Sequence, residues 1–89
     1  MKYVICYDIE DSKKRKKLSD LLEGYGVRVN YSVFEVDLKK NELLYLLKEI
    51  KKIIPKSDSV RFYHLCKNCI NKSFEVCDRL DVFENDAFI

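Results

Sequence analysis

Apolar residues along the 89-residue chain recur with two different periods, which predicts an alternation of strands and helices. Residues 2–8 and 59–65 are short runs of β-branched and aromatic residues, typical of strands. Residues 27–37 alternate apolar and polar positions, so we expect either one long strand or two short strands that fold back near Asn30. The first run is apolar on both faces, which indicates that helices cover one face of the sheet and further protein covers the other.

Two other segments repeat apolar residues at spacings of three and four, which predicts helices. The first helix begins at a cap on Asp11 or Ser12 and ends at Gly24 or Gly26. The second helix covers residues 39–54. If the alternating segment is a hairpin, the order of elements predicts an α+β fold of the ferredoxin-like βαββαβ type. In this sandwich both helices cover one face of a four-stranded antiparallel sheet, and the weakly alternating C-terminal tail adds an edge strand.

The face of the predicted sheet that the helices leave open is apolar whichever way the first strand points. It presents either Val4 and Cys6 or the set Tyr3, Ile5 and Tyr7. An apolar face of this kind predicts a two-fold homodimer that buries it. A chain this short also folds near the margin of stability, and a dimer interface would bury further surface.

The composition is 47% hydrophobic and 36% charged, which predicts a single domain over residues 1–89 and excludes a disordered chain. No apolar run is long enough to span a membrane, and the first residues lack a secretory cleavage site, so we expect a cytoplasmic protein with no membrane partner. Its four cysteines are then expected to be reduced. Cys66 and Cys69 form a CxxC motif, a weak zinc signal that His64 and Cys77 would have to complete.

The net charge of +2 says little about partners, but the basic run at the start of the first helix is informative. Acidic residues stabilise that end of a helix, so bases there suggest an anionic partner such as a phosphate backbone. The alternative is an exposed charged helix face. Arg15 is the member of the run able to make a bidentate phosphate contact, and Arg28 would add to it. The candidate contacts in the run are Lys13, Lys14, Arg15 and Lys17.

Asp8 ends the first apolar strand, a position where a carboxylate can hold a hard cation such as Mg²⁺. One carboxylate is a poor site, but a two-fold axis would supply two copies of Asp8. Such an ion would polarise a phosphoryl oxygen and activate a water molecule for phosphodiester attack. The alternative is a solvated turn in which Asp8, Glu10 and Asp11 only precede and cap the helix. After the CxxC motif, we expect a short strand at Ser73–Cys77.

Several features in order resemble one known family. They are a Tyr-Asp pair closing the first strand, an early arginine in the first helix, an Arg-x-x-x-Ser-Val-Phe-Glu stretch, and an Arg-x-Tyr strand that ends in Leu-Cys-x-x-Cys. Together these features, over residues 3–69, resemble the small CRISPR-associated endoribonuclease or endonuclease that is the second core protein of spacer acquisition.

The resemblance implies a ferredoxin-like homodimer that cuts RNA or DNA with Mg²⁺ and docks between copies of the adaptation integrase in antiviral defence. It implies that Asp8 is the catalytic and metal-binding residue and that a tail strand at residues 78–89 packs on the partner protomer. The nucleic-acid contacts that it implies are Tyr7, Arg15, Arg28 and Phe34. Two alternatives stay open: a non-catalytic DNA-binding architectural subunit that bridges the integrase, and a small regulatory dimer that binds a metabolite or metal.

Overall fold

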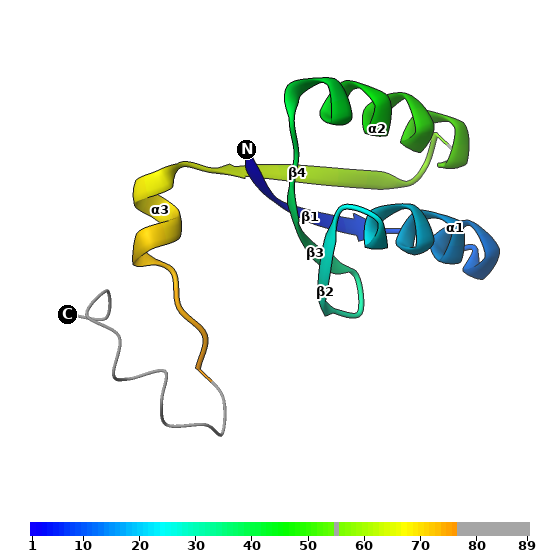
Figure 1. Ribbon diagram of the computed structural model, residues 1–89. Helices are drawn as coiled ribbons and strands as arrows, with labels where there is room; N and C mark the ends of the chain where they lie inside the picture. Colours follow the sequence, from blue (N-terminus) through cyan, green and yellow to red (C-terminus); the bar gives the residue numbers. More distant parts are fainter. Residues whose placement is uncertain (55, 77–89) are drawn as a thin grey trace.

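The computed structural model describes residues 1–54 and 56–76. Its elements are β1 (Lys2–Asp8), α1 (Ser12–Glu23), β2 (Gly26–Asn30), β3 (Val33–Asp37), α2 (Lys40–Ile53), β4 (Ser59–Leu65) and α3 (Lys67–Lys72). The four strands pair antiparallel in the order β2-β3-β1-β4, and α1 and α2 lie on one side of the sheet (Figure 1). The predicted ferredoxin-like α+β sandwich is therefore confirmed, and the alternating segment is a hairpin that turns at Tyr31 and Ser32.

The hydrophobic core lies between the sheet and the two long helices. Its fully buried side chains are Ile5 from β1, Phe34 and Val36 from β3, Leu18 and Leu22 from α1, Leu38 after β3, and Leu46 from α2. Burial of one such side chain contributes about 1.5–3 kcal/mol. These contacts fix α1 against the sheet, and the start of α1 therefore lies beside the end of β1.

The face of β1 that points away from the helices is the one bearing Val4 and Cys6. Ile5 and Tyr7 are buried, whereas Asp8 is exposed, because successive strand residues point to opposite faces. Of the two alternatives for the open face, the Val4 and Cys6 set is the one that the structure adopts.

The structure identifies the capping residues at both ends of α1. Asp11 is the N-cap, and its side chain accepts a hydrogen bond from the backbone N–H of Lys13 at 3.3 Å. Gly24 caps the C-terminal end, and Gly26 begins β2 instead. A helix end whose first N–H groups are satisfied in this way is typically more stable by about 1 kcal/mol.

After β4 the chain departs from the sequence-based expectation. The CxxC motif begins a helix, α3, which was not predicted and which lies beyond the end of β4, away from α1 and α2 (Figure 1). The prediction of a short strand at Ser73–Cys77 is wrong for residues 73–76. Ser73 caps α3, and residues 74–76 are exposed and lie outside any strand. The tail strand expected at residues 78–89 lies outside the described residues, and no helix within the described ranges is long and apolar enough to cross a membrane.

Candidate nucleic-acid cleft at the end of β1

A cleft of about 330 Å³ lies where α1, the end of β1 and the β2–β3 turn meet. One face of α1 supplies most of its wall, through residues that recur at intervals of three and four along the helix. The lining residues are Tyr7, Ser12, Arg15, Lys16, Ser19, Asp20, Glu23, Arg28 and Tyr31. Two arginines, a lysine and two tyrosines therefore surround one opening.

Tyr7 joins the end of β1 to the β2–β3 turn. Its backbone N–H donates to the carbonyl oxygen of Ser32 at 3.1 Å, and its hydroxyl donates to the carbonyl oxygen of Tyr31 at 3.5 Å. The ring stacks near that of Phe34, with centroids 6.3 Å apart. Burial raises the pKa of Tyr7, so its hydroxyl stays a neutral donor around neutral pH.

Arg15 holds the loop after β1 against α1. Its Nη1 donates to the carbonyl oxygens of Ile9 at 2.9 Å and Glu10 at 3.3 Å. The guanidinium also lies 5.5 Å from the centre of the Tyr31 ring, within range of a cation–π interaction. A guanidinium has further N–H donors, so it can hold these carbonyls and a phosphate together.

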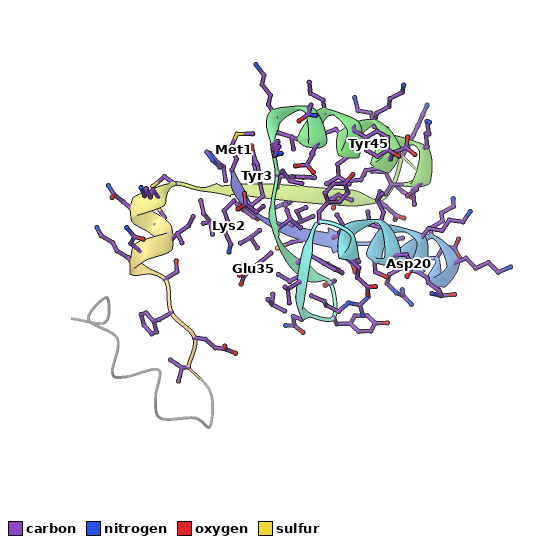
Figure 2. All side chains as sticks on the ribbon, in the orientation of Figure 1. Met1, Lys2, Tyr3, Asp20, Glu35 and Tyr45 are labelled. Carbon is purple, nitrogen blue, oxygen red and sulfur yellow. The ribbon has the colours of Figure 1, made fainter. Side chains whose placement is uncertain are left out.

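The other two cations of the cleft each face a carboxylate. Arg28 Nη2 lies 3.9 Å from Glu23 Oε1, and Lys16 Nζ lies 3.2 Å from Asp20 Oδ2. Figure 2 shows Asp20 on α1. Such exposed pairs are weak and leave both cations available to an anion. Within the described ranges, Arg15 is the cleft cation without a carboxylate partner. Its positive charge is therefore the least compensated in the cleft.

Phe34 does not reach the cleft surface. It is fully buried, and the Arg28 guanidinium lies 5.4 Å from its ring centre. The expected direct contact of Phe34 with nucleic acid does not fit this burial, because a base cannot stack on a ring enclosed by the core. The Phe34 ring instead packs against the guanidinium of Arg28.

The lysines of the basic run are divided between surfaces. Lys13, Lys14 and Lys17 do not line the cleft, whereas Lys16, which was not singled out, does. Its signal in the sequence was the helical spacing that places it on the same face as Ser12 and Ser19. Tyr31 is a lining residue because the hairpin returns to the end of β1, which alternation alone does not reveal.

Asp8 lies on the other side of the sheet from the cleft. It follows Tyr7 directly, so its exposed side chain points to the open face while Tyr7 points to the cleft. The described part of one protomer holds no group of three or more His, Cys, Asp or Glu side chains able to bind a metal. A single protomer therefore offers a hard cation one carboxylate at this position, and the donor set suits Mg²⁺ only if a second copy is added.

The fold and the cleft define a small ferredoxin-like protein with a cationic, tyrosine-lined cleft beside the end of its first strand. Residues 1–73 match the family model described as CRISPR associated protein Cas2, and the chain belongs to that family.

Individual relatives agree with this assignment. The chain is 56% identical over 64 residues to "CRISPR-associated endoribonuclease Cas2 3" of Synechocystis, covering 71% of this chain and 70% of the relative. It superimposes on the crystal structure of Streptococcus pyogenes Cas2 at pH 6.5 with a TM-score of 0.77 and 29% identity, over 86% of this chain and all of that one. A chain of the "Partial Cas6-RT-Cas1--Cas2 complex" matches with a TM-score of 0.73 and 42% identity, over 84% of this chain and 83% of that one.

Proposed function

We propose that this chain is the dimeric subunit of a spacer-acquisition complex and a metal-dependent endonuclease that cleaves single-stranded RNA, double-stranded DNA or both. The observation that carries the proposal is the cleft, where Tyr7, Arg15 and Arg28 from three elements meet at the end of β1. Asp8 follows Tyr7 directly and points to the opposite face of the sheet. Arg15 has no carboxylate partner within the described residues, and an arginine of this kind can neutralise a backbone phosphate.

The names of the relatives support the two halves of this proposal. The Synechocystis relative is named an endoribonuclease, which supports phosphodiester cleavage. The matching chain from the Cas6-RT-Cas1–Cas2 complex was solved together with Cas1, which supports an integrase partner. The partner of this chain would therefore be the CRISPR adaptation integrase.

The homodimer in the proposal forms through the open face of the sheet. That face carries Val4 and Cys6, and Val27 on β2 and Tyr63 on β4 are exposed hydrophobic side chains that a partner would cover. A two-fold axis through this face would place two Asp8 carboxylates at the interface. Mg²⁺ bound there would polarise a phosphoryl oxygen and activate a water molecule. Asp8 would be the residue that holds the ion and carries the catalysis.

A second candidate is a non-catalytic, DNA-binding architectural subunit that bridges the integrase. One observation favours it: in the described part of a protomer, Asp8 belongs to no cluster of metal-ligating side chains. In this case the cleft would bind DNA and Asp8 would do no required chemistry.

The first test is cleavage of labelled single-stranded RNA and double-stranded DNA by the purified protein. We expect cleavage of at least one substrate with Mg²⁺ and none with EDTA, because the ion supplies the activated water. Comparing the cleavage of the two substrates shows whether the protein cuts RNA, DNA or both. Salt-sensitive binding to DNA without any cleavage would refute the nuclease and leave the architectural subunit.

Arg15→Ala is expected to weaken nucleic-acid binding about tenfold or more, since hydrogen bonds to charged groups contribute roughly 1.5–3 kcal/mol. Arg15→Lys should recover only part of the affinity, because an ammonium cannot bridge the Ile9 carbonyl and a phosphate as a planar guanidinium does. Fluorescence anisotropy as a function of salt measures both the affinity and the number of phosphates neutralised.

The matched control for Arg15 is Lys13→Ala, which removes one positive charge from the same helix at a position outside the cleft. It should lower the affinity by less than Arg15→Ala does. Equal losses for the two variants would show that the general charge of α1, and not the cleft, binds the nucleic acid.

A further inference from the structure

The CxxC motif has no part in the proposed function, yet it brings two thiols into contact at the start of α3. The thiols of Cys66 and Cys69 are exposed, and the sulfur atoms lie 3.1 Å apart. The backbone N–H of Cys69 also donates to Cys66 Sγ at 3.3 Å. Cys66 Sγ therefore contacts two groups of Cys69, the thiol and the backbone N–H.

These contacts make the two thiols unequal. The hydrogen bond between the two thiols lowers the pKa of Cys66 and raises the pKa of Cys69. Cys66 is thus the thiol that ionises more readily, and the thiolate is the nucleophile in thiol–disulfide exchange. A pair with one activated thiol and one protonated neighbour has the arrangement of an attacking and a resolving cysteine.

A structural zinc site does not fit the surroundings of the pair. Structural zinc takes four protein ligands, and within residues 1–54 and 56–76 no three His, Cys, Asp or Glu side chains gather. The His64 ring packs against the Tyr3 ring, with the two ring centres 5.0 Å apart, and does not join the two cysteines. Within the described residues the pair therefore offers two sulfur atoms and no further ligand, which is what a disulfide requires.

We infer that Cys66 and Cys69 are a redox-active dithiol that exchanges with a low-molecular-weight disulfide of the glutathione type. The Cys66 thiolate attacks one sulfur of that disulfide, a mixed disulfide forms, and one thiolate leaves. Cys69 then loses its proton, attacks Cys66 Sγ and releases the second thiolate. The protein loses two electrons and two protons, and the small disulfide is reduced to two thiols.

Closure of the pair requires little movement. A disulfide is about 2 Å long, so the two sulfur atoms must approach by about 1 Å from their separation of 3.1 Å. The bond would fix the first turn of α3, a helix that has no buried residue. Ile70 of this helix lines a groove of about 870 Å³ on the open face, so the redox state would determine how firmly one wall of that groove is held.

The test uses the reduced full-length protein in glutathione buffers of defined ratio, followed by acid quenching, alkylation of free thiols, trypsin digestion and mass spectrometry. Trypsin cuts after Lys67 and so separates Cys66 and Cys69 into the peptides 62–67 and 68–72. We expect these peptides to be joined by a disulfide in oxidising buffer and to separate when the buffer is made reducing. Failure of the linked pair to form at any ratio would overturn the inference.

Single variants test the two roles. Cys69→Ser should accumulate a mixed disulfide with glutathione on Cys66, because the resolving thiol is missing. Cys66→Ser should form its mixed disulfide on Cys69 several-fold more slowly at neutral pH. Equal rates for the two variants would contradict the assigned order of attack.

Two further controls distinguish other outcomes. Cys77→Ser should leave the linked 62–67 and 68–72 peptides unchanged, whereas loss of the link would show that Cys66 and Cys69 are not the exchanging pair. A purified protein whose two thiols resist alkylation until a zinc chelator is added would also refute the dithiol. In the oxidised wild type, we expect slower hydrogen exchange at the amides of residues 66–72.

Discussion

Asp8→Asn is expected to abolish metal-dependent cleavage, to below about 1% of the wild-type rate, while binding of the nucleic acid is kept. The amide has the size of the carboxylate but no charge, and at a two-fold axis both copies are lost together. A metal ion supplies several kcal/mol of transition-state stabilisation, and each 1.4 kcal/mol is about tenfold in rate. Asp8 lies on the opposite face from the cleft, so binding through Arg15 and Arg28 should be unchanged or slightly stronger. Single-turnover cleavage and anisotropy on the same preparations measure the two effects.

The matched control is Asp37→Asn. Asp37 is an exposed aspartate whose register partner Lys2 stands at the opposite end of β1 from Asp8. It accepts a hydrogen bond from the N-terminal ammonium at 3.1 Å, an exposed ion pair that contributes at most about 1 kcal/mol. Asp37→Asn should therefore cleave at close to the wild-type rate. If Asp8→Asn cleaves as fast as Asp37→Asn does, Asp8 has no catalytic role and the architectural subunit is favoured.

Gly26→Ala is expected to destabilise the protein by about 3 kcal/mol, the upper end of what overpacking costs. Gly26 pairs with Val36 at the start of β2. A Cβ at this position would lie 2.7 Å from Val36 Cα and 2.9 Å from the Glu35 carbonyl carbon, and closer still to the Glu35 carbonyl oxygen. These are backbone atoms of the neighbouring strand, so no side-chain rotation relieves the overlap and β2 must move away from β3. Thermal unfolding should shift down by roughly 12–24 °C for a domain of this size.

The displacement of β2 should also weaken nucleic-acid binding. Arg28 lies two residues further along β2, and its guanidinium rests over the Phe34 ring of β3. The matched control is Gly24→Ala. There the added Cβ would meet only the Leu21 carbonyl oxygen at 3.4 Å, and the backbone φ of −70° suits alanine. This variant should be within about 1 kcal/mol of wild type. Equal destabilisation of the two variants would refute the close approach of β2 to β3.

Hydrophobic spacing predicted most of the fold because period and burial are tied to local geometry. Residues 39–54 were expected to form a helix, and α2 covers Lys40–Ile53. Its apolar residues form a wide stripe of which only part faces the core, since Leu44 is 61% exposed while Leu46 and Ile50 are buried. Period alone cannot decide which side of a wide stripe faces the sheet. The choice between one strand and a hairpin at residues 27–37 likewise needed the pairing of β2 with β3.

The candidate site was predicted in part. Tyr7, Arg15 and Arg28 were named from the sequence, and the structure brings these three into one cleft. Phe34 was expected to contact nucleic acid because it is the aromatic residue of the Ser-Val-Phe-Glu stretch that resembles the family, but its face of β3 is the core face. The sequence does not show whether an aromatic residue on a strand is buried, because its burial depends on whether a helix packs against that face of the sheet.

The sequence by itself determined the order of strands and helices, the caps available to α1 and the residue types of the site, because these follow from spacing and local chemistry. Tertiary structure decided which face of β1 stays open and that Tyr31 lines the same cleft as Tyr7. These relations join residues through the sheet register and the helix packing. They arise only when distant segments come together, and no local pattern encodes them.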